Sequence, residues 1–228
     1  MRVLTWNDLL FLPYAARWTV ALSAAAFAGG GLIGLIVALL RVSRRRPLRW
    51  LAVAYIRVFQ GTPLLLQLFL VFFGSDLLGI GLGAYVSAIL GLSLNAGAFL
   101  GEIWRGSIEA VPAGQVEAAR ALGLRYGARM LRVVAPQALR VAAAPTVGFL
   151  VNLVKSTSLA AVIGFVELTR AGQLLNNATF RPFAIFGTVA LIYFVLCWPL
   201  TLASRRLEVR LARAYQLSYT GRPDRRPV

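Results

Sequence analysis

Long stretches without a single charge constrain the fold of this chain more than any other feature. Residues 18–40, 58–75, 77–101 and 182–204 are uncharged, and residues 141–166 are interrupted only by Lys155. Because about 20 apolar residues span a bilayer as a helix, we predict an all-α membrane protein with five transmembrane helices. The expected spans are residues 18–41, 62–78, 82–104, 138–164 and 182–204.

The composition agrees with a membrane protein. Of the 228 residues, 59% are hydrophobic and only 14% are charged, and the mean hydropathy is +0.73. A soluble domain would have to hide every apolar stretch in one modest core. The chain has one cysteine and no histidine, which removes a disulfide framework and the commonest metal ligand. We therefore expect neither a metal nor a cofactor.

The net charge of +16 comes almost entirely from arginine. Such an excess can indicate nucleic-acid binding, but here we interpret it as the orientation signal of a membrane protein, with no nucleic-acid partner. One side of the expected topology carries most of it: Arg41, Arg44, Arg45, Arg46, Arg49, Arg57, Arg105, Arg120, Arg125, Arg129, Arg132, Arg140, Arg205, Arg206, Arg210, Arg213, Arg222, Arg225 and Arg226. The other side has only Arg2, Arg17, Arg170 and Arg181. The positive-inside rule predicts an outer N-terminus and a cytoplasmic C-terminus.

These boundaries divide the chain into three parts. Residues 1–17 form an N-terminal arm, which is either an interfacial helix or a passive extension. Residues 18–204 form the transmembrane domain. Residues 205–228 form a basic cytoplasmic tail, which we expect to be helical as far as about residue 214.

Residues 112–136, between the third and fourth spans, form a polar and basic segment. We expect a first short helix from near Gln115, a left-handed cap at Gly123, and a second helix over residues 125–134 that Pro136 ends. The segment could also be a basic amphipathic helix lying on anionic headgroups. That alternative explains the arginines, but it does not explain Glu117-Ala118-Ala119 followed by a glycine hinge.

This segment resembles the coupling motif of ATP-binding-cassette importer permeases, which reads Glu-Ala-Ala, three residues, Gly, nine residues, Ile-x-Leu-Pro. Here the motif reads Glu117-Ala118-Ala119, Gly123, Val133, Ala135 and Pro136. Further blocks are similar to the branch of permeases for polar amino acids, and they follow in order along the chain: Phe59–Leu65, Glu102–Gly106, Pro112–Gly123, Ala135–Arg140, Lys155–Leu159 and Glu167–Arg170.

The resemblance implies a type I importer fold and a permease subunit that imports a polar or acidic amino acid, or a derivative, by alternating access. It implies that Glu117, Ala118, Ala119 and Gly123 couple the chain to a cytoplasmic ATPase. The chain has no Gly-Lys pair for a phosphate-binding loop, so we expect no enzymatic activity, with ATP bound by the partner. The implied partners are two ATPase subunits, a second copy or a paralogue, and a periplasmic or tethered substrate-binding protein, at the bacterial inner membrane.

Polar residues inside apolar spans are the candidates for the substrate pathway, because they are costly there. They are Asn95, Glu102, Lys155, Ser156, Thr157 and Ser158. Each also has a structural interpretation. Lys155 can pair with a carboxylate or cap a broken helix, the hydroxyls can repair a bent helix backbone, and Glu102 can contact Arg105.

Some positions depart from the branch pattern. Relatives often have an acidic residue at Ser156, a tyrosine at Phe99 and an arginine at Gln60, and the missing acid argues against a strongly cationic substrate.

Alternatives to the importer are a secondary transporter or channel driven by an ion gradient, a membrane enzyme and a membrane scaffold. The first predicts inverted repeats or more embedded carboxylates, and the second a nucleophile–base or metal constellation, none of which the sequence displays.

Overall fold

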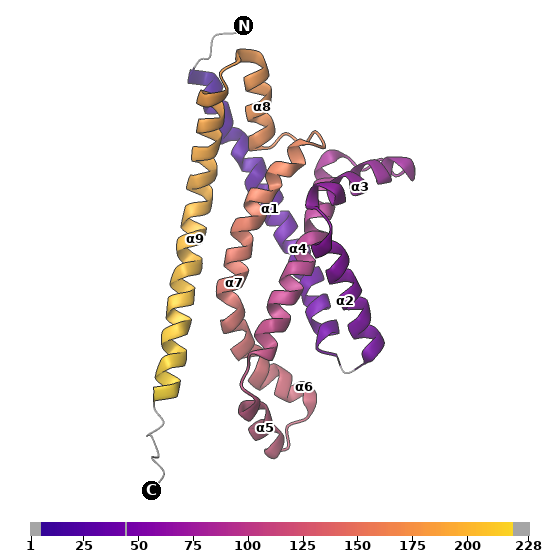
Figure 1. Ribbon diagram of the computed structural model, residues 1–228, viewed down its shortest axis with the longest axis vertical. Helices are drawn as coiled ribbons and strands as arrows, with labels where there is room; N and C mark the ends of the chain where they lie inside the picture. The colour runs from indigo at the N-terminus through magenta and orange to yellow at the C-terminus, as the bar shows by residue number, and fades with distance from the viewer. Residues whose placement is uncertain (1–5, 44, 221–228) are drawn as a thin grey trace.

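The protein is a bundle of helices, with no strand in the part of the chain that the structure describes. The computed structural model describes residues 6–43 and 45–220 (Figure 1). The elements are α1 Trp6–Arg41, α2 Arg46–Gly61, α3 Leu64–Leu77, α4 Ala84–Glu109, α5 Ala113–Ala121, α6 Tyr126–Arg129, the π segment Met130–Val134, α7 Ala135–Ser156, the 3-10 segment Thr157–Ala161, α8 Leu168–Thr179 and α9 Pro182–Thr220. Residues 1–5 of the predicted arm and 221–228 of the predicted tail lie outside the described residues.

The bundle has candidate membrane spans that are long and apolar enough to cross a bilayer. They are Leu10–Arg41, Ala84–Glu109, Tyr126–Ala161 and Pro182–Leu211, making 4 spans, or up to 5 if α2 and α3 together form one. Helices α5 and α6 lie at one end of the bundle and α8 at the other (Figure 1). We refer to these as the α5–α6 end and the α8 end. The prediction of a multi-span helical protein is confirmed.

The predicted second span differs most from the structure. Helix α3 has 14 residues, about 21 Å at 1.5 Å per residue, which is shorter than a bilayer core. It meets α2 at an angle of 102°. Pro63 explains the break, since it lacks an N–H donor and forces the preceding residue into extended backbone; Thr62 has φ −115° and ψ 144°.

Helix α1 is longer than predicted. It is continuous from Trp6 to Arg41, so the predicted boundary between arm and span at residue 18 lies inside the helix. Leu12, Ala15 and Ala16 are buried in a cluster with Leu168 and Val189, from α8 and α9. These tertiary contacts favour helix in a segment that is too short to span a membrane alone. Helix α9 continues past residue 204 into the predicted tail, as expected, but it reaches Thr220 and does not end near residue 214.

Glycine sets the closest contact in the bundle, between α1 and α4. A Cβ added at Gly30 would lie 2.5 Å from the Cβ of Ala96, and one at Gly34 would lie 2.9 Å from the Cβ of Leu100. From the other side, a Cβ at Gly97 would lie 2.5 Å from Ile33 Cγ2. The absence of these side chains lets the two backbones approach each other, as small residues do between membrane helices.

Residues 112–136 are more continuous than predicted. Helix α5 ends at Ala121, and Gly123 in the turn that follows has the left-handed φ of +73° that we expected. The Leu124 N–H donates to the Ala119 carbonyl at 3.1 Å and the Gly123 N–H to the Arg120 carbonyl at 2.9 Å, the two bonds of a Schellman cap. Pro136 does not end the following helix, because the π segment Met130–Val134 runs directly into α7. The wider π turn accommodates a proline that an α-helical turn would reject.

Candidate functional site

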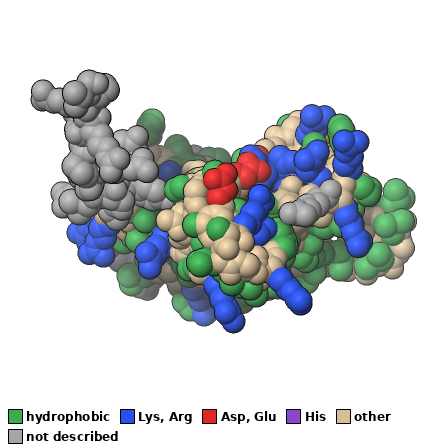
Figure 2. Space-filling model, turned by 90° about the horizontal axis from the view of Figure 1, so that it is seen from below, with side chains coloured by type: hydrophobic (Ala, Val, Ile, Leu, Met, Phe, Trp, Pro, Cys, Tyr) green, Lys and Arg blue, Asp and Glu red, His purple; other side chains and the backbone are tan. Residues whose placement is uncertain are grey.

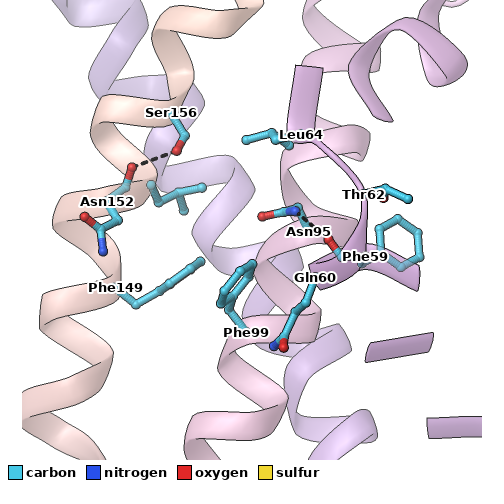
Figure 3. A pocket seen from close by; sticks show the side chains of 10 residues that line it. Phe59, Gln60, Thr62, Leu64, Asn95, Phe99, Phe149, Asn152 and Ser156 are labelled. Atoms are coloured by element: carbon cyan, nitrogen blue, oxygen red, sulfur yellow. Dashed lines mark hydrogen bonds between the residues drawn. The ribbon is translucent and has the colours of Figure 1, made fainter. Parts of the chain in front are cut away.

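A polar cavity of about 300 Å³ lies between the α2–α3 bend, α4 and α7. Its polar side chains are those of Gln60, Thr62, Asn95, Asn152 and Ser156, and the remainder of its lining is Phe59, Leu64, Phe99, Phe149 and Leu153. Figure 3 shows Asn152 and Ser156 on α7, across the cavity from Asn95 and the bend. No lining side chain among the described residues is charged. The volume is at the lower end of the range for ligand pockets, as befits a small solute.

Amide side chains hold the bend that forms one wall of the cavity. The break at Pro63 frees backbone carbonyls that would otherwise be bonded inside a helix. Gln67 Nε2 donates to the carbonyls of Phe59 at 2.8 Å and Thr62 at 3.0 Å. Asn95 Nδ2 donates to the Phe59 carbonyl at 3.2 Å and to Gln67 Oε1 at 3.1 Å. Asn95 therefore lines the cavity and also ties α4 to the bend.

The hydroxyls at the end of α7 and in the 3-10 segment that follows bond to the helix backbone. Ser156 Oγ donates to the Asn152 carbonyl at 2.9 Å, Thr157 Oγ1 to the Val154 carbonyl at 2.7 Å, and Ser158 Oγ to the Lys155 carbonyl at 2.7 Å. These bonds satisfy carbonyls where the α-helix changes to a 3-10 helix. Ser156 alone of these hydroxyls lines the cavity, and Thr157 is fully buried.

Lys155 and Glu102 do not line the cavity. The Lys155 side chain is exposed, and within the described part of the chain it makes no ion pair. Glu102 lies between two arginines: Arg105 Nε donates to Glu102 Oε1 at 2.9 Å, and Arg41 Nε is 3.6 Å from Glu102 Oε2. This confirms the alternative contact with Arg105. The Arg41–Glu102 pair joins α1 to α4, and Arg105 also contacts Glu109.

The predicted coupling residues lie on α5 and in the turn that follows it. Glu117, Ala118 and Gly123 are exposed, whereas Ala119 is buried. Beneath them, Val111, Val134 and Ala138 form a small apolar cluster between the end of α4 and the start of α7. The exposed residues therefore form a surface at the α5–α6 end that is supported from below.

A second polar cluster, absent from the predicted site, surrounds Glu167 near the α8 end. The side chain is completely buried. Its carboxyl group accepts from the Tyr193 hydroxyl at 2.8 Å, the Thr19 hydroxyl at 3.3 Å and the Arg170 backbone N–H at 2.9 Å. The last bond caps the N-terminus of α8. The cluster joins α1, α8 and α9, and we assign it to the stability of this end of the bundle.

Replacing Glu167 with alanine is expected to destabilise the protein by roughly 3 kcal/mol, because it leaves buried hydroxyl and N–H groups without an acceptor. Glu167→Gln keeps one acceptor oxygen and should lose less. Thermal unfolding of purified protein measures both. Glu208→Ala on α9 is the matched control, since that carboxyl group is exposed. Equal melting temperatures for Glu167→Ala and Glu208→Ala would show that the cluster does not stabilise the fold.

The structure adds residues to the predicted site that the sequence only partly indicated. Asn152 and Ser156 are four residues apart, so they share a helix face, and this spacing could have identified Asn152. Gln67 is a polar residue in an apolar run, so the criterion that identified Asn95 could also have identified it, whereas Phe149 lies in an apolar run without a distinguishing pattern. No three described acidic or cysteine side chains lie close enough together to hold a metal ion.

The spans and the polar cavity between them define a multi-pass α-helical membrane protein. The chain belongs to the family of binding-protein-dependent transport system inner membrane components, which it matches over residues 30–213. It is 38% identical to the L-cystine transport system permease protein TcyB of Bacillus subtilis over 197 residues, which are 86% of this chain and 84% of that protein. It is 34% identical to the probable glutamine ABC transporter permease protein GlnM of the same organism over 197 residues, 86% of this chain and 91% of that protein.

Solved structures of ABC transporters contain chains with a similar fold. An amino acid ABC transporter crystallised with histidines has a chain that is 32% identical, with a TM-score of 0.84 over 92% of this chain and 100% of that chain. The MetNI methionine ABC transporter in an inward-facing conformation gives a TM-score of 0.77 at 22% identity over 90% of this chain and 97% of that chain, which shows a shared fold. The resemblance to amino-acid ABC permeases is thereby confirmed.

Proposed function

We propose that this chain is the permease subunit of an ATP-driven importer for an uncharged polar amino acid. The observation that carries the proposal is the cavity, whose lining in the described chain offers amides and hydroxyls but no charge. A zwitterionic solute can bond to such groups. An additional side-chain charge would lose water there without gaining a charged partner, at a cost that rises with burial. A relative named as a probable glutamine permease supports this substrate class.

The proposed orientation places the α5–α6 end in the cytoplasm of a bacterium and the N-terminus outside its inner membrane. Basic side chains support it. Figure 2 views the molecule from the α5–α6 end and shows them spread across that end, with few acidic side chains among them. The exposed arginines include Arg45, Arg49, Arg125 and Arg206. Cytoplasmic ends of membrane proteins have this excess.

The proposed coupling surface consists of Glu117, Ala118 and Gly123. Glu117 and Ala118 are exposed on α5, where a groove of a cytoplasmic ATPase subunit would bind them, and the Schellman cap at Gly123 fixes the turn next to them. Two ATPase subunits, a second permease copy or a paralogue, and a periplasmic or tethered substrate-binding protein complete the proposed transporter. Hydrolysis in the ATPases would drive the permease pair between inward-facing and outward-facing states.

Proteoliposomes that contain this chain, its ATPase and its substrate-binding protein test the proposal. We expect uptake of labelled glutamine that requires ATP inside the vesicle, and uptake of arginine or glutamate lower by roughly tenfold or more. Uptake that persists without ATP but stops when the ion gradient is dissipated would identify a secondary transporter instead. Equal uptake of charged and uncharged amino acids would contradict the substrate class alone.

A further inference from the structure

Two stacked phenylalanine rings bound one end of the polar cavity. Phe99 on α4 and Phe149 on α7 have ring centroids 5.6 Å apart and an interplanar angle of 20°. Figure 3 shows them extending toward each other from facing helices. Both rings belong to the cavity lining, and they meet in the space between α4 and α7.

The register of both helices places the stack on the same side of the polar groups. Helix α4 runs toward the α5–α6 end, and Phe99 follows Asn95 by one turn. Helix α7 runs the opposite way, and Phe149 precedes Asn152 by about one turn. The rings therefore lie between the polar side chains of α4 and α7 and the α5–α6 end, and Gln60 of α2 lies beside Phe99, where its Nε2 donates to the Ala98 carbonyl at 3.2 Å. One turn further in that direction, Trp104 Nε1 donates to Thr146 Oγ1 at 3.0 Å, so α4 and α7 remain in contact beyond the stack.

We propose that the Phe99–Phe149 stack is the barrier between the polar cavity and the cytoplasm, and that solute leaves when the two rings separate. The inference rests on the proposed function for its orientation and its solute. Two apolar rings in contact leave no space for water and offer no hydrogen-bond partner to a polar solute. An apolar constriction of this kind stops hydrated solutes even when it is only one layer of residues thick.

The chain contains a matched control in a second aromatic stack. Phe194 and Trp198 on α9 have ring centroids 6.1 Å apart and an interplanar angle of 16°. Their side chains are 59% and 54% exposed, and neither lines the cavity. Truncating Phe194 removes the same kind of contact without opening the cavity.

Thiol accessibility tests the barrier without requiring transport. Cys197 is the only cysteine, so Cys197→Ala provides a thiol-free background, and Ser156→Cys places a reporter in the cavity wall. The full chain, assembled with its partner subunits in inside-out vesicles, is treated from the cytoplasmic side with a charged, membrane-impermeant methanethiosulfonate. We expect Phe99→Ala or Phe149→Ala to accelerate labelling roughly two- to tenfold, as loss of an aromatic contact should. Phe194→Ala should not accelerate it.

The conservative variants Phe99→Leu and Phe149→Leu, which retain apolar bulk, should give a smaller increase than the alanine variants. Three results would overturn the barrier. The labelling rate could be unchanged in both alanine variants, it could increase equally in Phe194→Ala, or it could increase only when the reagent is on the side opposite the cytoplasm. If the labelling rate is unchanged in the alanine variants and ATP-dependent uptake is normal, the barrier is rejected and the proposed function stands. Accelerated labelling in the alanine variants supports the barrier, and it rejects the proposed function only if the protein that retains both rings shows no ATP-dependent uptake.

Discussion

Replacing Gly30 with valine is expected to prevent the protein from folding in the membrane. The first added carbon would lie 2.5 Å from the Cβ of Ala96 and 3.2 Å from the Ser93 carbonyl oxygen. The second contact is with backbone, which no rotamer change can relieve. Helices α1 and α4 would have to separate along their whole interface. Overpacking usually costs about 1–3 kcal/mol, and a clash with backbone belongs at or above the upper end of that range.

The neighbouring glycine provides the control. A Cβ at Gly31 would meet only the end of the Trp104 ring, at 3.8 Å, which is an ordinary van der Waals contact. Gly31→Val adds the same side chain to the same helix and should therefore fold. The measurement is the yield of monodisperse protein after detergent extraction, together with its melting temperature. If the two variants behave alike, the α1–α4 contact does not depend on glycine.

Replacing Glu117 with lysine is expected to abolish transport while the permease folds normally. Glu117 is exposed on α5 and makes no ion pair with another described residue, so the change removes no internal contact and should alter stability by less than about 0.5 kcal/mol. At a docking surface, reversing a charge next to basic groups of a partner costs several kcal/mol. Binding to the ATPase would weaken by more than about a hundredfold, since 1.4 kcal/mol is a factor of ten.

Two measurements separate coupling from folding in this variant: ATP-dependent uptake in proteoliposomes and the stimulation of ATPase activity by the loaded binding protein. Both should fall to background in Glu117→Lys, and Glu117→Asp should restore part of each. Glu208→Lys makes the same charge change on an exposed position of α9 and should leave both unchanged. Normal uptake and stimulation in Glu117→Lys would mean that α5 does not dock the ATPase through this residue.

The sequence predicted the membrane helices well where the composition of a single segment is enough to place it in the bilayer. Uncharged runs located α4 and the apolar parts of α1, α7 and α9, because crossing a bilayer is a property of one segment. The extension of α1 to Trp6 depends on Leu12 and Ala16 packing against α8 and α9. Such contacts between distant segments leave no local pattern. The bend at Pro63 was indicated by Gly61-Thr62-Pro63, but its angle of 102° depends on the amides that hold it.

The site was predicted less completely, for a related reason. Asn95 and Ser156 were identified because polar residues are unusual in apolar spans, and both line the cavity. Lys155 was the most conspicuous residue by the same criterion, yet its side chain lies outside the cavity. Charge identifies a span position as unusual, but helix packing decides which face it occupies. Phe149 shows the converse, since an apolar residue in an apolar span carries no signal of its own.

The unbroken helix from Tyr126 to Ala161 has a mechanical consequence. This helix starts beside the exposed surface of α5 and carries Asn152 and Ser156 in the cavity wall. The α5 surface and the cavity wall are therefore connected by one rod-like helix. From Met130 to Asn152 the rod is about 33 Å long at 1.5 Å per residue, and tilting it by about 5° at its base displaces the cavity wall by about 3 Å. A displacement about as wide as a water molecule thus requires only a small rotation at the far end of the molecule.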